Sequence, residues 1–111
     1  MTVWYHVRDL AAGRAFYKDK LGFNETYVDA DASWAKLERN GTEIALAEGE
    51  PQEDNGVAHV DVENVKLVAD ELRSDGVEVG VVFELHAEMR LLDVFDPDGN
   101  RLQFAEELSA G

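Results

Sequence analysis

Apolar and polar residues alternate in short runs on both sides of one helix-like segment in the first half of the chain. Apolar residues between positions 10 and 21 recur at helical spacing. Asp9 precedes them in the position of an N-cap, and Gly22 follows as a C-terminal stop. Strands are predicted around this helix at roughly 3–7, 24–29, 33–39 and 42–48. The last two are joined by Asn40 and Gly41, a dipeptide typical of tight hairpins.

The second half repeats this order of elements after a polar, acidic segment at 49–56. Strands are predicted at 57–62, 77–83, 89–95 and 101–105, with a helix between the first two. Asn64 would cap that helix, and it follows Asp9 by 55 residues. The sequence therefore predicts an α+β fold of two βαβββ modules, residues 1–48 and 57–108, joined by a linker at 49–56.

Strand alternation assigns side chains to the two faces of each sheet. The apolar residues of strand 3–7 must face the helix, which leaves Trp4 and His6 on the opposite side. The same alternation leaves His59 and Asp61 opposite the second helix. We expect two curved mixed sheets around a shared concave cavity, with the helices on the outer face. A small-molecule site is expected in that cavity.

Composition narrows the possible functions. The chain has 111 residues, enough for one ordinary domain, and no cysteine, which excludes disulfides and thiolate zinc sites. Its 10 basic and 24 acidic residues give a formal net charge of -14, which disfavours nucleic-acid binding. Such a surface is typical of a solubility adaptation such as life at high salt, and it would also attract cationic ligands. With no signal peptide and no long apolar run, we expect a soluble cytoplasmic protein without a membrane partner.

Two segments resemble the signatures of a known superfamily. The runs VRDLAAGRAFYKDKLGF and DVFDPDGNRLQF are similar to those of the vicinal oxygen chelate superfamily, which includes glyoxalase I, extradiol dioxygenases and bleomycin-resistance proteins. The resemblance covers essentially the whole chain and implies the paired βαβββ fold. It also implies a homodimer, in which the loop at 49–56 would permit the exchange of modules.

Metal-dependent members of this superfamily hold one divalent ion with four side chains, one from each of four strands. The matching positions in this sequence are Thr2, Ala45, Val57 and Gln103. Valine and alanine have no donor atom, whereas a divalent ion needs three or four imidazole or carboxylate ligands. We therefore expect no metal cofactor of the usual type. A shifted metal site made from His6, His59, Asp61 or Glu43 stays open as an alternative.

The predicted function is that of a metal-independent binding protein resembling the bleomycin-resistance branch, which sequesters a cationic or aromatic ligand between the modules without a chemical step. The predicted ligand-binding residues are Trp4, His6, Glu43, His59, Asp61 and Gln103, and no catalytic residue is assigned. Trp4 would stack on the ligand, the carboxylates would attract it, and the histidines would form hydrogen bonds. Of the two tryptophans, Trp4 is the better candidate for stacking, and both also fit ordinary core or interface anchors.

Three other interpretations of the same residues stay open. One is a metal-dependent glyoxalase-like lyase or isomerase, or a dioxygenase-like enzyme. Such an enzyme would need the divalent ion, or else His6 or His59 as a general base. His6 could also approach Asp61 across a pseudo-twofold axis between the modules, and that pair could act as a base or anchor a ligand. In the second, both histidines are ordinary half-buried residues bonded to their neighbours. In the third, the chain is a scaffold without a ligand, and its own side chains fill the cavity.

Overall fold

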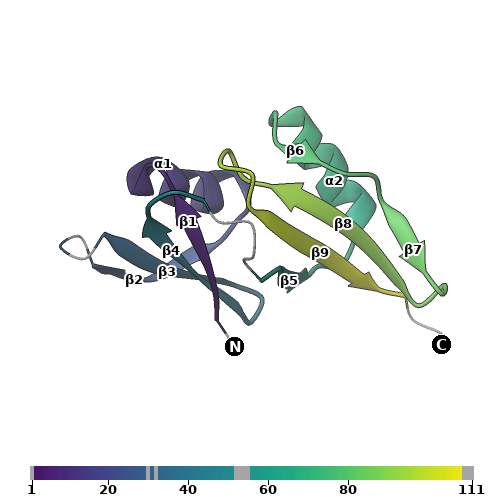
Figure 1. Cartoon of the computed structure of the whole chain (residues 1–111). Helices are drawn as coiled ribbons and strands as arrows, with labels where there is room; N and C mark the ends of the chain where they lie inside the picture. The colour runs from purple at the N-terminus through teal and green to yellow at the C-terminus, as the bar shows by residue number, and fades with distance from the viewer. Residues whose placement is uncertain (1, 30, 32, 52–55, 109–111) are drawn as a thin grey trace.

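The computed structural model describes residues 2–29, 31, 33–51 and 56–108 (Figure 1). The first module contains β1 (Val3–Val7), α1 (Leu10–Ala15), the π-helical turn η1 (Phe16–Lys20), β2 (Asn24–Asp29), β3 (Trp34–Arg39) and β4 (Thr42–Glu48). The second contains β5 (Ala58–Asp61), α2 (Val65–Ser74), β6 (Glu78–Val79), β7 (Phe83–Leu85), β8 (Met89–Phe95) and β9 (Arg101–Glu107). Of the linker predicted at 49–56, residues 52–55 lie outside the described part of the chain.

Each module forms its own sheet. The first has the strand order β1-β4-β3-β2, and the second has the order β5-β9-β8-β6 with β7 also paired to β8. In both sheets the first strand of the module runs parallel to the last, and the other pairs are antiparallel. The sheets lie side by side along a molecule of 49 × 27 × 25 Å, each with its own helix (Figure 1). The predicted α+β fold of two βαβββ modules is confirmed.

The helix ends lie where the sequence predicts them. Asp9 Oδ1 accepts a hydrogen bond from the Ala12 N–H at 3.1 Å, and Asn64 Oδ1 accepts one from the Leu67 N–H at 3.0 Å. Both carboxylate and carboxamide oxygens satisfy donors that the first helical turn leaves free. Gly22 ends the first helix with a φ of 71°, a conformation that glycine adopts without steric cost.

One predicted strand is wrong in its extent. The segment predicted as a single strand at 77–83 forms two short strands, β6 and β7, and residues 80–82 belong to neither. The pairing explains the break, because Val79 lies opposite Val94 whereas Phe83 lies opposite Leu91. Phe83 is four residues after Val79, whereas their partners on β8, Leu91 and Val94, are three residues apart. An extra residue of this kind interrupts the hydrogen-bond ladder and bends the strand.

Buried hydrogen bonds join the two modules into one core. The Tyr5 hydroxyl donates to the Arg101 carbonyl at 2.6 Å and accepts from the Ala58 N–H at 2.9 Å. Tyr5 is fully buried, and burial raises its pKa to about 12, so the hydroxyl keeps its proton. The Asn100 carboxamide donates to the His6 carbonyl at 2.8 Å. Within the described part of the chain, no helix has the length and apolar character needed to cross a membrane.

Candidate functional site

The faces predicted for the first strand of each module are confirmed by burial. Trp4 is 46% exposed, whereas Tyr5 and its neighbours on the same side pack into the core. His59 and Asp61 are exposed and alternate with buried residues of β5. The side chains predicted for ligand binding thus lie on the sheet faces that point away from the helices.

Three aromatic side chains meet on this face of the first sheet, and we call Trp4, Tyr27 and Trp34 the aromatic cluster. The ring centroids of Trp4 and Trp34 are 5.5 Å apart, and those of Tyr27 and Trp34 are 5.0 Å apart. Trp4 and Trp34 come from β1 and β3, with β4 between them. They meet over β4 because the residues paired with them there are Ala45 and Ala47, which carry only a methyl group.

The aromatic cluster is open to solvent and already holds a cation. Trp4 is 46% exposed and Tyr27 is 49% exposed, so ring surface is available to a ligand. The Lys36 ammonium lies 5.7 Å from the centroid of the Trp34 ring, within the range of a cation–π contact. Sequence reasoning missed Tyr27 and ranked Trp34 below Trp4. The signal for Trp34 was the register of the Asn40-Gly41 hairpin, which places Trp34 opposite Ala47.

His6 and Glu43 lie on the same face as the aromatic cluster. His6 is paired with Ala47, the residue that is also opposite Trp34. Its Nδ1 atom is buried and has no hydrogen-bond partner among the described residues. Glu43 Oε1 accepts a hydrogen bond from the Thr2 hydroxyl. The first sheet therefore brings together three of the predicted residues, Trp4, His6 and Glu43.

The other three predicted residues lie on the second sheet. His59 is paired with Gln103, and the Gln103 carboxamide donates to Asp93 Oδ1 at 3.2 Å. Asp93 also forms an ion pair with Arg101 at 3.8 Å. Asp61 is paired with Ala105 on the neighbouring strand β9, and its side chain is exposed. His59, Gln103 and Asp93 form a polar row across β5, β9 and β8.

His6 and Asp61 are in different sheets, and no hydrogen bond or ion pair joins them among the described residues. Their backbone carbonyls have other partners: Asn100 donates to His6, and Asn40 donates to Asp61 at 2.7 Å. Hollows lined by described residues lie at the end of α2, between the β3–β4 hairpin and α2, and between η1 and the β8–β9 turn. None of these three is lined by the aromatic cluster.

The four positions that match the metal ligands of the resembled superfamily do not fit a divalent ion. The Thr2 hydroxyl donates to Glu43, and the Gln103 carboxamide donates to Asp93. Ala45 is fully buried and Val57 is half-buried, and neither has a donor atom. Over the ranges that the structure describes, no three His, Asp or Glu side chains lie close enough together to hold an ion.

Comparison with known proteins agrees with this architecture. A family model described as the Glyoxalase/Bleomycin resistance protein/Dioxygenase superfamily matches residues 2–104. A search of curated proteins finds no match. Among solved structures, an integron cassette protein from the Halifax Harbour sewage outfall metagenome has a TM-score of 0.83 at 24% identity, covering 96% of both chains.

Two further structures have the same fold. A superfamily member from Sphaerobacter thermophilus has a TM-score of 0.81 at 20% identity, covering 96% of this chain and 94% of its own. The bleomycin-binding protein of Streptomyces verticillus, solved with copper(II)-bleomycin, has a TM-score of 0.74 at 21% identity, with coverage of 96% and 93%. The family match spans nearly the whole chain and agrees with the paired modules. The chain therefore belongs to the glyoxalase/bleomycin resistance protein/dioxygenase superfamily.

Proposed function

We propose that this protein binds a small cationic, aromatic molecule on the aromatic cluster, without a metal ion and without a chemical step. The observation that carries the proposal is the exposed ring surface of Trp4, Tyr27 and Trp34, on which the Lys36 ammonium already lies. A ligand cation would take the place of this ammonium over the Trp34 ring. The net charge of -14 raises the local concentration of such ligands.

The other predicted residues add specificity to this site. His6 Nδ1 is buried and has no hydrogen-bond partner among the described residues, so a ligand group that displaced the atoms covering it could form a hydrogen bond there. Glu43 contributes negative charge on the same face. His59, Gln103 and Asp61 on the second sheet would meet a larger ligand. The likeness to a bleomycin-binding protein supports a cationic antibiotic as one ligand class.

Titration of tryptophan fluorescence with ethidium, a flat aromatic cation, tests the proposal. Both tryptophans of the chain belong to the aromatic cluster, so quenching reports on this site directly. We expect saturable quenching whose Kd rises several-fold between 0.1 M and 1 M NaCl, because the screening length falls from about 10 Å to about 3 Å. Caffeine, which is flat but neutral, should bind more weakly and show little dependence on salt. Absence of quenching, or an ethidium Kd that salt does not change, would refute a site based on charge and stacking.

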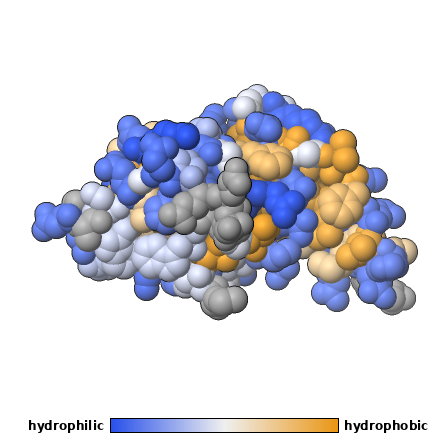
Figure 2. All heavy atoms as spheres, viewed as in Figure 1, coloured by the Kyte–Doolittle hydropathy of each residue, from blue (hydrophilic) through white to orange (hydrophobic). Residues whose placement is uncertain are grey.

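We also propose that the protein forms a homodimer through the second sheet. Figure 2 shows hydrophobic residues gathered over β7 and β8. Val81 is 76% exposed, Phe83 is 40% exposed and Leu85 is 45% exposed. Contiguous apolar surface of this kind is typical of an interface. A second copy covering it would place another surface beside the polar row and enlarge the binding site.

Light scattering coupled to gel filtration tests the homodimer. The wild-type protein should elute with twice the chain mass of 12.4 kDa, and Leu85→Glu should elute as the monomer at the same concentration. Leu67→Glu is a matched control, because Leu67 is 54% exposed but lies on α2, so this variant should stay dimeric. A wild-type mass equal to one chain would contradict the proposal.

A further inference from the structure

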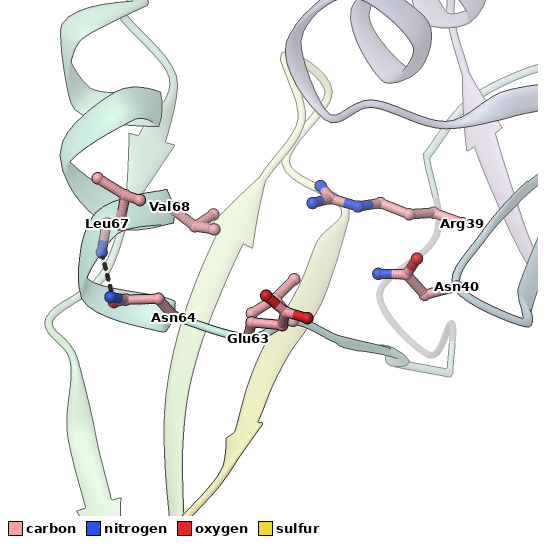
Figure 3. A pocket seen from close by; sticks show the side chains of 7 residues that line it. Arg39, Asn40, Glu63, Asn64, Leu67 and Val68 are labelled. Carbon is pink, nitrogen blue, oxygen red and sulfur yellow. Dashed lines mark hydrogen bonds between the residues drawn. The ribbon is translucent and has the colours of Figure 1, made fainter.

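A hollow of about 370 Å³ separates the β3–β4 hairpin of the first module from the start of α2 in the second (Figure 3). The hairpin is fixed beside it by two hydrogen bonds to β5: Asn40 Nδ2 donates to the Asp61 carbonyl, and Thr42 Oγ1 donates to the His59 carbonyl. On the other side, the Asn64 side chain is engaged as the cap of α2. Both walls of the hollow are therefore held in place before a ligand binds.

Arg39 lines this hollow and forms no ion pair with any residue that the structure describes. Its Nη1 donates to the Leu21 carbonyl at 2.7 Å, and its guanidinium carbon lies 5.1 Å from the centroid of the Phe104 ring. No carboxylate of the described residues is within ion-pair distance of it. Burial lowers the pKa of Arg39, opposed by the charge of Glu71. An arginine has five N–H donors, so most of its hydrogen-bonding capacity is available to a ligand.

A carboxylate lies across the hollow from this cation. Figure 3 shows the Arg39 guanidinium directed from the hairpin toward α2 and the Glu63 carboxylate in the space between the two modules. Glu63 is exposed and forms no ion pair with Arg39. A simple anion would be repelled by Glu63, by Glu71 and by the net charge of -14. A zwitterion carries no net charge and can satisfy Arg39 and Glu63 together.

The remaining wall of the hollow is apolar. Val62, Leu67 and Val68 line it, and the Leu67 side chain is 54% exposed although it is large and aliphatic. Covering this side chain with an aliphatic group would remove apolar surface from water, at about 25 cal/mol per Å². The ligand chemistry that fits all three walls is a carboxylate, an ammonium group and an aliphatic side chain.

We infer that this hollow is a second small-molecule site, which binds a free α-amino acid with an aliphatic side chain. Arg39 receives the carboxylate through paired N–H donors, as guanidinium groups do with carboxylates elsewhere. Glu63 receives the ammonium group, and Leu67 and Val68 contact the side chain. The site lies between the modules at α2, away from the aromatic cluster, so it does not depend on the function proposed for that cluster.

Calorimetric titration with L-leucine tests this inference. We expect saturable binding, with at least about tenfold weaker binding of 4-methylpentanoate, which lacks the ammonium group, and of 3-methylbutylamine, which lacks the carboxylate. Arg39→Gln and Glu63→Gln should each weaken leucine binding by about tenfold or more. Arg73→Gln is a matched control, because Arg73 lies on α2 and also donates to one carbonyl, that of Gly80.

Glu63→Gln keeps the test decisive if Arg39→Gln does not fold, because Glu63 is exposed on the surface. Leucine binding that Glu63→Gln leaves unchanged would overturn the inference. Equal binding of the three compounds would also overturn it, as would the absence of leucine binding up to about 50 mM, well above a Kd of 1 mM. None of these outcomes bears on ethidium binding at the aromatic cluster, so the two proposals fail separately.

Discussion

Replacing Trp34 by alanine should weaken ethidium binding by about thirtyfold, equivalent to about 2 kcal/mol. Trp34 is the central ring of the aromatic cluster, because it contacts both Trp4 and Tyr27. Its removal takes away the surface on which a cation lies and also the support that orients the two outer rings. Isothermal titration calorimetry measures the effect without relying on tryptophan emission.

Two further variants make this prediction specific to the ring face. Trp34→Phe keeps an aromatic surface and should lose less affinity than Trp34→Ala. Lys36→Gln removes the ammonium that competes for the Trp34 ring and should leave ethidium binding unchanged or tighten it. A Trp34→Ala protein that is folded, as judged by circular dichroism, and binds ethidium like wild type would show that the ligand binds elsewhere.

Asp96→Ala should reduce the free energy of unfolding by about 3 kcal/mol, because it leaves several buried donors without an acceptor. The Asp96 carboxylate is only 4% exposed. Its Oδ1 accepts from the N–H groups of Asp98 and Asn100, and its Oδ2 accepts from the Tyr17 hydroxyl and the Asn100 carboxamide. Tyr17 belongs to the first module, so the carboxylate holds the β8–β9 turn and also joins the two modules.

Thermal and urea unfolding would measure this loss, which corresponds to a fall in Tm of roughly 15 °C. Burial, together with the charge of Asp96, raises the pKa of Tyr17 well above its usual range, so its hydroxyl keeps donating to Asp96. Asp98→Ala is the matched control in the same turn. Its side chain forms an ion pair with Arg8, whose own side chain is 60% exposed to solvent, and the loss should be no more than about 1 kcal/mol. A stability within 1 kcal/mol of wild type for Asp96→Ala would mean that the turn is held by its backbone alone.

Local signals in the sequence were sufficient to predict the order of elements. Asp9 and Asn64 cap the helices because their side chains bond to backbone groups three residues away, an interaction that needs no tertiary contact. The Asn40-Gly41 turn likewise depends on the dihedral preferences of two residues, which have φ values of 51° and 84°. Strand alternation then placed Trp4, His6, His59 and Asp61 on the faces away from the helices.

The contacts that make up the site depend on strand register, which local signals do not determine. Trp4 and Trp34 are 30 residues apart and meet only because β4 brings alanines between them. The extra residue between Val79 and Phe83 has the same origin, since it follows from the pairing with β8. The partner of Arg39, Phe104, comes from the other module and has no signal near Arg39 in the sequence.

The central claim is that the aromatic cluster binds a cationic aromatic molecule without a metal ion. Titration of tryptophan fluorescence with ethidium, in protein dialysed against EDTA and in the same protein supplemented with zinc or nickel, tests it most directly. Ethidium itself has no metal-chelating group, so any effect of metal must come from the protein. We expect saturable quenching with the same Kd in both samples. Quenching that occurs only in the metal-supplemented protein would contradict the claim.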